Sequence, residues 1–325
     1  MPVVVTGASG FLGGRLAQIL AAQGADVIVI ARSRSGLRHL EDLPIRIVRT
    51  ELADGEPLQS ACRTATHIYH CAGCSTDWAP WQTYCDANVI GTQAMLAAAR
   101  HGSRLERFVH VSTTDVYGYP AVPCDESQPL TDVGLPYNRS KCQGEAAVWT
   151  AHREGTVPVT ILRPATIFGP RGKAFTTDIA LLLKQRGMAL FDHGRARGGF
   201  CYVDNVADAL ILAGNSLATL GRAYNITDDT GATWKDYVQA LAAGLGLREP
   251  WLDLPSRLAL PLAGALEWTY THLPLPGRPI LTRHAVQLLS KDQEYPTDRA
   301  RRDFGLSPAV SWSESLERSI AWLKD

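Results

Sequence analysis

The stretch PVVVTGASGFLGGRLAQIL, residues 2–20, joins a valine-rich segment to an apolar-periodic one through three evenly spaced glycines. The first segment is typical of a strand covered on both faces, and the periodicity of residues 11–22 predicts a helix. Gly7 has no Cβ and permits a sharp turn out of the strand, while Gly13 allows the helix to pack closely against it. Gly10 leaves the N–H groups of the first helical turn accessible to an anion. The stretch therefore predicts a cradle for a nucleotide diphosphate at the start of a βαβ unit.

The remainder of the first half repeats this alternation of apolar strands and amphipathic helices. Further strands are predicted at 26–31, 45–49, 67–71, 107–112 and 157–163, and helices at 82–101 and 137–154. Regular alternation of buried strands with helices predicts an α/β fold built on a doubly wound parallel Rossmann sheet.

The regular alternation of strands and helices ends after Pro164, where the sequence predicts a smaller and mostly helical domain. We expect a loop at 167–175, helices at 175–186 and 204–215, short strands near 200–204 and 223–227, and mainly helices from Thr233 onward. Ser311 and Glu314 have the spacing of a capping box for the last helix. We assign residues 1–168 to an NAD(P)-binding domain, to which 200–227 return, and 169–325 mainly to a substrate-binding domain.

The composition of the 325-residue chain excludes several classes of protein. Lys and Arg together number 32, as do Asp and Glu, so the formal net charge is zero. We expect no basic face for nucleic acid and no polybasic segment for a lipid surface. The first predicted strand begins too close to Met1 for a signal peptide, and seven scattered cysteines form no disulfide framework. These features predict a cytoplasmic protein whose partner is a small molecule.

Cys71 and Cys74 form a CxxC, which is typical of a thiol redox pair or of half a zinc site. No second cysteine pair or His-x-x-x-His stretch follows to complete a tetrahedral site. Small residues at the end of a buried strand explain this pair better than either kind of site.

The segment RLALPLAGALEWTYTHLPLPG, residues 257–277, is the most apolar part of the second half. It predicts no transmembrane span, because Arg257, Pro261 and Glu267 interrupt it. Two interpretations stay open: the segment lines an apolar substrate pocket, or it is ordinary core with some interfacial character.

The residues that follow the second predicted strand bear on the choice of cofactor. An acidic residue at that point accepts hydrogen bonds from the adenosine ribose and disfavours a 2′-phosphate. This chain has Arg32 there, and a guanidinium pairs with phosphate and stacks on adenine. We therefore favour NADP(H), with NAD(H) as the alternative; a merely solvated arginine loop is the other interpretation.

Tyr137 and Lys141 are four residues apart and so share one face of a predicted helix. A free phenol titrates near about pH 10, and a neighbouring ammonium lowers that pKa and makes the group a better acid–base catalyst. Ser112, Thr113 and Thr114 follow the preceding strand and bring hydroxyls to the carboxyl edge of the sheet. Ligands bind at that edge in open α/β sheets, so these residues predict an acid–base site.

Seven motifs follow one another along the chain: TGASGFLG at 6–13, HCAG at 70–73, NVIGT at 88–92, STTDVYG at 112–118, YNRSK at 137–141, RPATIFGP at 163–170 and FCYVDNVADA at 200–209. By their order and spacing the chain resembles an extended short-chain dehydrogenase/reductase of the NAD(P)-dependent epimerase/dehydratase family, over essentially its whole length. Residues 281–308 further resemble the 3β-hydroxysteroid dehydrogenase-like branch, which includes bacterial reductases of long-chain β-keto acids.

The resemblance implies roles for the residues at matching positions. Tyr137 would exchange the proton, Lys141 would tune its pKa and bind the ribose, and Thr113 would polarise the substrate oxygen. Ser112 is the alternative to Thr113, and Asn88 would be mainly structural. Besides Tyr137 and Lys141, the implied cofactor-binding residues are Gly7, Ser9, Gly10, Phe11, Leu12, Gly13, Arg32, Leu52, Cys71, Ala72, Gly73, Pro164, Thr166 and Ile167. A homodimer through the helices at 82–101 and 137–154 is common among relatives, and no metal site is implied.

Departures from the family pattern bear on the reaction. Sugar-nucleotide dehydratases follow the catalytic Thr with Asp-Glu, whereas this chain has Thr-Asp at 114–115. Sugar-nucleotide enzymes often carry Arg-Asp where this chain has glycines at 198–199, although Arg195 and Arg197 lie nearby. Both departures lower the expectation of sugar-nucleotide chemistry.

Trp78, Trp81 and Tyr84 follow the fourth strand, where they suit an apolar or ring-bearing substrate or else pack beneath a lid. We predict an NAD(P)-dependent oxidoreductase that moves a hydride between nicotinamide and the carbonyl or secondary alcohol of a fairly apolar substrate. That substrate would be 3β-hydroxysteroid-like or a β-keto compound. A nucleotide-sugar epimerase is the alternative enzyme, and a non-catalytic dinucleotide-binding regulator is the alternative from another class.

Overall fold

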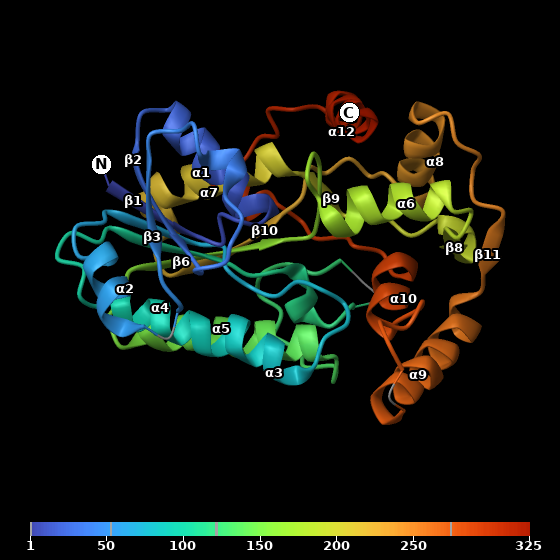
Figure 1. The fold of residues 1–325 in the computed structure, drawn as a ribbon, viewed down its shortest axis with the longest axis horizontal. Helices are drawn as coiled ribbons and strands as arrows, with labels where there is room; N and C mark the ends of the chain where they lie inside the picture. The colour runs from blue at the N-terminus through green and yellow to red at the C-terminus, as the bar shows by residue number, and fades with distance from the viewer. Residues whose placement is uncertain (1, 53, 121–122, 274) are drawn as a thin grey trace.

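The computed structural model describes residues 2–52, 54–120, 123–273 and 275–325. Its centre is a parallel sheet with the strand order β10-β6-β5-β4-β1-β2-β3 (Figure 1). The strands are β1 Pro2–Thr6, β2 Asp26–Ala31, β3 Ile45–Arg49, β4 His67–His70, β5 Arg107–Val111, β6 Val159–Pro164 and β10 Arg222–Ile226. The interior strands are almost wholly buried, whereas β3 at the edge is partly exposed, as expected when helices cover both faces.

Helices cover both faces of the sheet, which confirms the predicted doubly wound architecture (Figure 1). Alternate residues of β1 contribute to two different hydrophobic cores, with Val3 and Val5 in one and Val4 in the other. The first core contains α1 and α7, and the second contains α2, α4 and α5. These helices are α1 Phe11–Ala22, α2 Gly55–Cys62, α4 Gly91–Ala99, α5 Pro136–Arg153 and α7 Val203–Asn215.

The strand order reverses between β1 and β4, which are neighbours although two strands separate them in the sequence. The loops that follow these two strands therefore diverge and leave a crevice at the carboxyl edge of the sheet. The loops after β5 and β6 end at the same edge, because all of these strands are parallel. The fold thus brings together the predicted glycine loop, the hydroxyl-rich loop and the segment after Pro164.

The second half adds two small parallel sheets and several helices (Figure 1). Strand β7 Thr166–Phe168 pairs with β9 Phe200–Tyr202, and β8 Ala189–Phe191 pairs with β11 Leu252–Leu254. The helices of this part are α6 Asp178–Lys184, α8 Trp234–Gly244, α9 Ser256–His272, α10 Arg283–Ser290, α11 Asp298–Phe304 and α12 Trp312–Lys324. Between them, α7 packs on α1 and β10 extends the central sheet beside β6.

Three local predictions require correction. The helix predicted at 82–101 consists of a short helix α3 at Trp81–Tyr84, a π-helical turn at Cys85–Ile90 and α4. The loop predicted at 167–175 contains most of β7 and the start of a second π-helical turn, Lys173–Thr177. Strands of three residues such as β7 are too short to show a period, and their pairing depends on a distant segment. Strands β8 and β11 were missed for the same reason.

The capping box predicted for α12 is half correct. The Ser311 hydroxyl accepts a hydrogen bond from the Glu314 backbone N–H, as predicted. The Glu314 carboxylate does not return to the cap; it pairs with Arg318 one turn further along the helix, at 2.6 Å. A full capping box occurs instead at α8, between Thr233 and Asp236.

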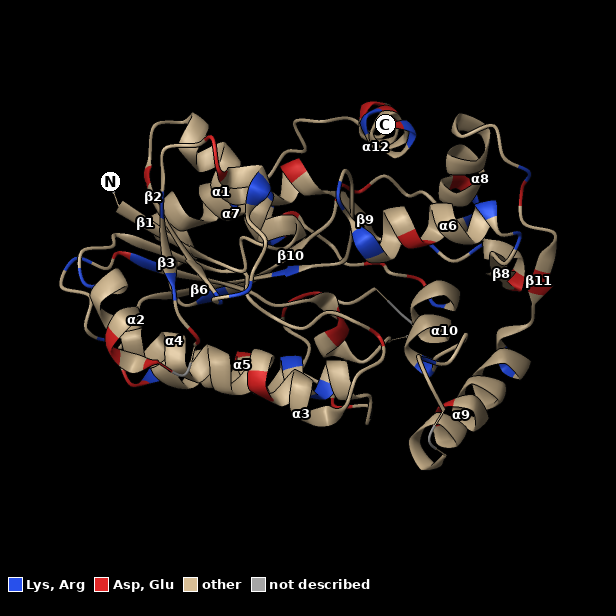
Figure 2. Ribbon diagram, viewed as in Figure 1, with Lys and Arg blue, Asp and Glu red and all other residues tan. Residues whose placement is uncertain are grey.

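Helix α9 has apolar residues on two faces. Ala259 and Ala263 are buried against α10, whereas Leu258, Leu262 and Trp268 are 52–64% exposed. The core interpretation of segment 257–277 therefore holds for one face of this helix. Within the described part of the chain, no helix combines the length and the apolar character needed to cross a membrane. Figure 2 shows acidic and basic residues interspersed along the ribbon, as the balanced composition predicts.

Candidate active site

The glycine loop after β1 has the geometry that its sequence predicts. Gly7 has φ +72°, and a Cβ there would lie 2.7 Å from the backbone of Cys71 and Ala72 after β4. A Cβ on Gly13 would lie 2.6 Å from the Gly7 carbonyl oxygen. Gly7 and Gly13 are therefore fixed by the turn and by close helix–strand packing, because any larger residue would displace backbone.

The first turn of α1 is open to an anion. Its N-cap, Gly10, is exposed and has no side chain to cap the helix, and the first turn contains no acidic residue. The N–H groups of Phe11 and Leu12 therefore lie at an uncapped positive end of the helix dipole, next to Ser9. A diphosphate would supply the acceptors that this turn lacks, so the loop fits a dinucleotide.

The loop after β2 presents Arg32 to solvent at the same edge of the sheet. The Arg49 guanidinium donates hydrogen bonds to the carbonyls of Arg32, Ser33 and Ser35, at 3.3, 3.0 and 3.2 Å. These hydrogen bonds fix the backbone of the loop, and the Arg32 side chain stays available for a ligand. Leu52, beyond β3, packs against Gly91 at the start of α4.

The loop after β4 is held by Asn88, which is structural as the resemblance implies. Asn88 exchanges hydrogen bonds of 2.7 and 3.0 Å with the backbone of Cys74 and donates a third, at 2.8 Å, to Ser140 on α5. It lies in the π-helical turn, 3% exposed, and so ties the loop at Cys71–Gly73 to the helix that carries Tyr137.

Cys71 and Cys74, the CxxC pair, lie in the loop after β4 and are not joined by a disulfide in this structure. All seven cysteines are free thiols. Burial raises the pKa of Cys71 to about 12, which leaves it a neutral thiol at physiological pH. Among the described residues, no three His, Cys, Asp or Glu side chains gather in a way that could hold a metal ion.

Tyr137 and Lys141 lie in the first turns of α5, and Thr113 follows β5. The Lys141 ammonium donates a 2.7 Å hydrogen bond to the carbonyl of Val111, the last residue of β5. The Thr113 side chain caps the 3₁₀ turn Thr114–Tyr117 and accepts from the Asp115 N–H at 3.2 Å. At the carboxyl edge of the sheet the structure thus brings Lys141 to the end of β5 and Thr113 beside Tyr137.

The titration of this cluster differs from the prediction. Burial raises the pKa of Tyr137 well above its ordinary value, and the charge of Asp115 raises it further; the Thr113 hydroxyl opposes the rise. Burial also lowers the pKa of Lys141 to about 8, against the charge of Glu145. Desolvation is the largest influence on that pKa, so the net lowering predicted from the spacing of Tyr137 and Lys141 is wrong for the protein by itself.

Ser112, the alternative to Thr113, is engaged elsewhere. Its hydroxyl donates a 2.6 Å hydrogen bond to Glu145, a carboxylate with no solvent exposure. Glu145 forms a buried ion pair with Arg163, which in turn donates to the Tyr117 hydroxyl at 2.7 Å. Ser112 thus belongs to a buried polar network with Glu145, Arg163 and Tyr117, whereas Thr113 is outside this network.

Sequence reasoning missed a second polar group beside Tyr137. His284 on α10 hydrogen-bonds Asp115 through Nε2 at 3.0 Å, and its ring centroid lies 5.4 Å from that of Tyr137. The ring of Tyr119 also packs against His284, with 6.1 Å between the two ring centroids. The only signal in the sequence was the match of segment 281–308 to one branch of the family, which assigned no role to the histidine.

Aromatic residues form a wall of the site. Tyr84 is 1% exposed, donates to the Thr76 carbonyl at 2.8 Å and packs its ring 6.3 Å from that of Tyr137. Trp78 contacts Tyr270 of α9 edge-on. Trp81 instead lies at the surface beneath Arg139. Of the three predicted aromatics, Tyr84 is thus the one that touches Tyr137.

The segment after β6 completes the crevice. Pro164 ends β6, and Thr166 and Ile167 begin β7. The Thr166 hydroxyl is buried and has no hydrogen-bond partner among the described residues, which fits a ligand that carries a polar group at this point.

The glycines at 198–199 are required by packing. A Cβ on Gly198 would lie 2.1 Å from the Phe200 ring, and one on Gly199 would lie 2.7 Å from Gln293. The two arginines considered as substitutes are engaged nearby, Arg195 with the Asp192 carbonyl and Arg197 with Glu294. Glycines thus occupy the positions where sugar-nucleotide enzymes often carry the charged pair, and Arg195 and Arg197 lie nearby with partners of their own.

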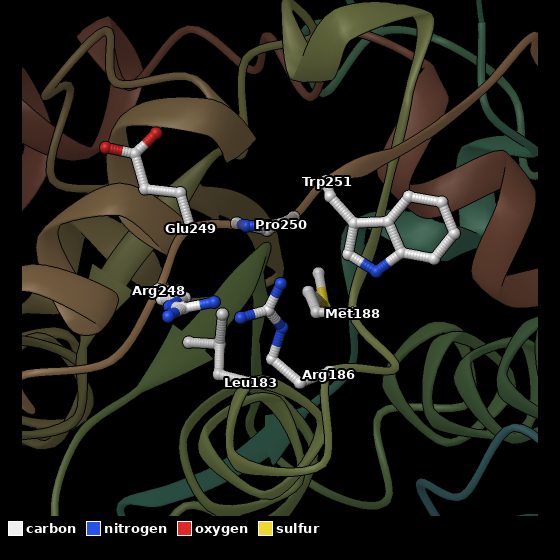
Figure 3. Close-up of a pocket in the computed structure, with 7 residues that line it drawn as sticks. All are labelled: Leu183, Arg186, Met188, Arg248, Glu249, Pro250 and Trp251. Atoms are coloured by element: carbon white, nitrogen blue, oxygen red, sulfur yellow. The ribbon is translucent and has the colours of Figure 1, made fainter.

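A separate recess lies between the end of α6 and the segment that follows α8 (Figure 3). It is lined by Leu183, Arg186, Met188, Arg248, Glu249, Pro250 and Trp251. None of these residues contacts Tyr137, Thr113 or Lys141 in the interactions described above, so the recess is not part of the candidate site.

Comparison with known proteins bears on this geometry. The model of the NAD dependent epimerase/dehydratase family matches residues 3–227. The chain is 30% identical over 328 residues to a 2-alkyl-3-oxoalkanoate reductase of Stenotrophomonas maltophilia, with 98% of both chains covered. It is 29% identical to the 4-hydroxy-2-methyl-3-oxo-4-farnesyl-3,4-dihydroquinoline-1-oxide ketoreductase of Stigmatella aurantiaca, with 98% of this chain and 95% of that protein covered. The solved UDP-glucuronic acid 4-epimerase from Bacillus cereus, in complex with NAD, shares the fold, with a TM-score of 0.79, 22% identity and coverage of 100% and 99%.

Proposed function

The chain belongs to the NAD-dependent epimerase/dehydratase family, and on that basis we propose that it reduces the 3-oxo group of an apolar β-keto compound with NADPH. That it is an NAD(P)-dependent oxidoreductase acting on a carbonyl or alcohol follows from the family and from the two ketoreductases it is similar to. The β-keto substrate and the preference for NADPH are the proposed parts.

The proposed reaction assigns each residue of the cluster a step. A nicotinamide held in this crevice would supply the hydride for the carbonyl carbon. Tyr137 donates its phenolic proton to the carbonyl oxygen as that oxygen gains charge, and the Thr113 hydroxyl donates a hydrogen bond to the same oxygen. Lys141 would bind the ribose and return a proton to Tyr137, which its pKa of about 8 suits. Gly7, Gly10 and Gly13 would leave room for the diphosphate.

The proposal is supported by Thr113 and the aromatic ring of Tyr84 beside Tyr137, by Lys141 at the end of β5, and by glycines where sugar-nucleotide enzymes often carry a charged pair. Burial keeps the Tyr137 phenol protonated, so a proton is present for the carbonyl oxygen, although the raised pKa makes the phenol a weaker acid. Residues 1–168 and 200–227 would hold the dinucleotide, and 169–325 would supply most of the substrate contacts. Pairing of two copies through α4 and α5 stays a prediction.

Net consumption of NADPH tests the function. Purified protein given a long-chain 2-alkyl-3-oxo acid should oxidise NADPH in a one-to-one ratio to the 3-hydroxy product. A UDP-sugar control should leave the nicotinamide absorbance and the sugar unchanged. Isomerisation of the sugar, with no net change in NADPH when the 3-oxo acid is offered, would overturn the proposal in favour of an epimerase.

Arg32 should decide the preference for the phosphorylated cofactor. Arg32→Ala removes a guanidinium that can pair with a 2′-phosphate, so KM for NADPH should rise about tenfold to a hundredfold, while KM for NADH stays within about threefold. Arg46→Ala, which removes an exposed arginine of β3 that is paired with Ile28 and so lies away from the carboxyl edge, is the control and should change neither constant. An equal increase in KM for NADPH and NADH would show that Arg32 stacks on adenine without binding the 2′-phosphate.

A further inference from the structure

The pair formed by Asp115 and His284 lies directly against Tyr137 and has no part in the proposed hydride transfer. Asp115 is the second residue after Thr113, and His284 comes from α10, 169 residues further along the chain. The carboxylate binds Nε2 of the imidazole, and the ring then stands 5.4 Å from the ring of Tyr137. The imidazole thus lies next to the phenol that would donate a proton to the substrate carbonyl.

The second nitrogen of His284 has no partner. His284 is 8% exposed, and its Nδ1 makes no hydrogen bond among the described residues. Tyr119 is 7% exposed; its hydroxyl lies near Asp115 but also makes no hydrogen bond of normal geometry. Buried polar atoms without partners are rare because each one costs free energy. Two of them beside one candidate site point to a ligand that supplies the missing partner.

The backbone supports the same interpretation. Tyr119 has φ +58°, in the left-handed region that side chains other than glycine seldom occupy, and it follows Gly118 at φ +74°. Such strain persists where the surrounding structure holds a side chain in a required position, and it is frequent at ligand sites. Here it holds the phenol of Tyr119 against the imidazole.

The charged groups around His284 indicate which kind of ligand atom fits beside its Nδ1. Burial lowers the pKa of His284, but the hydrogen bond and charge of Asp115, together with Asp77 and Glu267, raise it on balance. Asp77 is already paired with Arg278, and Glu267 with Arg283, so Asp115 is the partner that acts directly. A protonated imidazole held at Nε2 by a carboxylate presents an N–H donor at Nδ1. An anionic acceptor at Nδ1 would itself favour this protonated form, so the ligand atom that we assign to this point is an acceptor.

We propose that the His284 Nδ1–H, assisted by the Tyr119 hydroxyl, binds the carboxylate of a free 3-oxo acid whose carbonyl lies at Tyr137 and Thr113. The inference rests on the proposed function and names the substrate class within it. In a 3-oxo acid a single carbon separates the ketone carbon from the carboxylate carbon. A substrate held at both ends thus needs two neighbouring donor groups, as Tyr137 and His284 provide. An ester or a steroid ketone lacks the charged acceptor.

The test compares an acid with its methyl ester in the oxidative direction, because 3-hydroxy acids are stable compounds. The full-length enzyme with NADP⁺ should oxidise 2-hexyl-3-hydroxydecanoate with a kcat/KM about 30-fold above that of the ester, the ratio expected for one charge-assisted hydrogen bond. In His284→Gln the amide can still reach Asp115 but offers no donor at the Nδ1 position. The acid preference should fall to about threefold or less, mainly through a higher KM for the acid.

Two further variants separate binding from folding. His284→Asn places an amide near the Nδ1 position, so it should retain part of the preference for the acid. Tyr119→Phe should lower that preference with little change on the ester. A parallel loss on acid and ester in His284→Gln would show a structural role and overturn the carboxylate site. Equal activity of the wild type on both compounds would overturn it while the ketoreductase assignment stands; inactivity on both would overturn that assignment as well.

Discussion

Replacing Tyr137 by phenylalanine should lower kcat about 10³-fold, with only a small effect on the binding of NADPH. The phenol is the only proton donor assigned to the carbonyl oxygen, and general acid catalysis contributes about 10² to 10⁴ in rate. The ring itself packs between Tyr84 and His284, at 6.3 and 5.4 Å, and phenylalanine preserves both contacts. The fold and the dinucleotide cradle should therefore survive, so the loss falls on the chemical step.

The matched control is Tyr84→Phe, because it removes a hydroxyl one ring away from the proposed proton donor. The Tyr84 hydroxyl donates to the Thr76 carbonyl and has no role in the proposed reaction, so kcat should stay within about fivefold. Rates come from NADPH absorbance, and cofactor binding comes from the rise in melting temperature that NADPH produces in each variant. If Tyr137→Phe keeps a tenth or more of the wild-type rate, another group donates the proton. Unaltered behaviour in every assay would favour a non-catalytic regulator.

The parts of the fold that the sequence predicts are those governed by local constraints. Gly7 and Gly13 are conspicuous because each satisfies a steric demand within a single strand–turn–helix unit, where a Cβ would displace backbone. The interior strands are conspicuous because helices on both faces require continuous apolar runs. Both patterns can be recognised within about twenty residues, so they can be identified without knowledge of the tertiary structure.

The parts that the sequence does not predict depend on contacts between distant segments. His284 hydrogen-bonds Asp115, which lies 169 residues earlier in the chain, and its helix α10 packs on α9. No local sequence pattern encodes a contact between segments so far apart. The engagement of Ser112 by Glu145 follows from the placement of α5 on the sheet, so the choice between Ser112 and Thr113 required the structure. The direction of the Tyr137 pKa was mistaken for a related reason: burial, not spacing, determines it.

The largest loss of stability is expected from Glu145→Gln, since this carboxylate neutralises a buried guanidinium. Glu145 has no exposure, and it accepts hydrogen bonds from Ser112 at 2.6 Å, from Trp149 at 3.0 Å and from two nitrogens of Arg163. The Arg163 side chain is 4% exposed and would keep its charge without a counter-ion. Removing one partner of a buried ion pair costs about 3–5 kcal/mol of unfolding free energy.

Urea unfolding provides the measurement, with a surface ion pair as the comparison. Glu154→Gln removes a carboxylate from the Arg100 pair, whose side chains are 47% and 49% exposed, and should cost less than about 1 kcal/mol. Glu145→Gln should shift the unfolding midpoint strongly at an unchanged slope. Because the penalty comes from the uncompensated charge, the double variant Glu145→Leu, Arg163→Met should recover part of the loss, even though it removes every hydrogen bond of the pair. If Glu145→Gln unfolds at the same urea concentration as Glu154→Gln, the network beneath Ser112 does not hold the two strands β5 and β6 to α5.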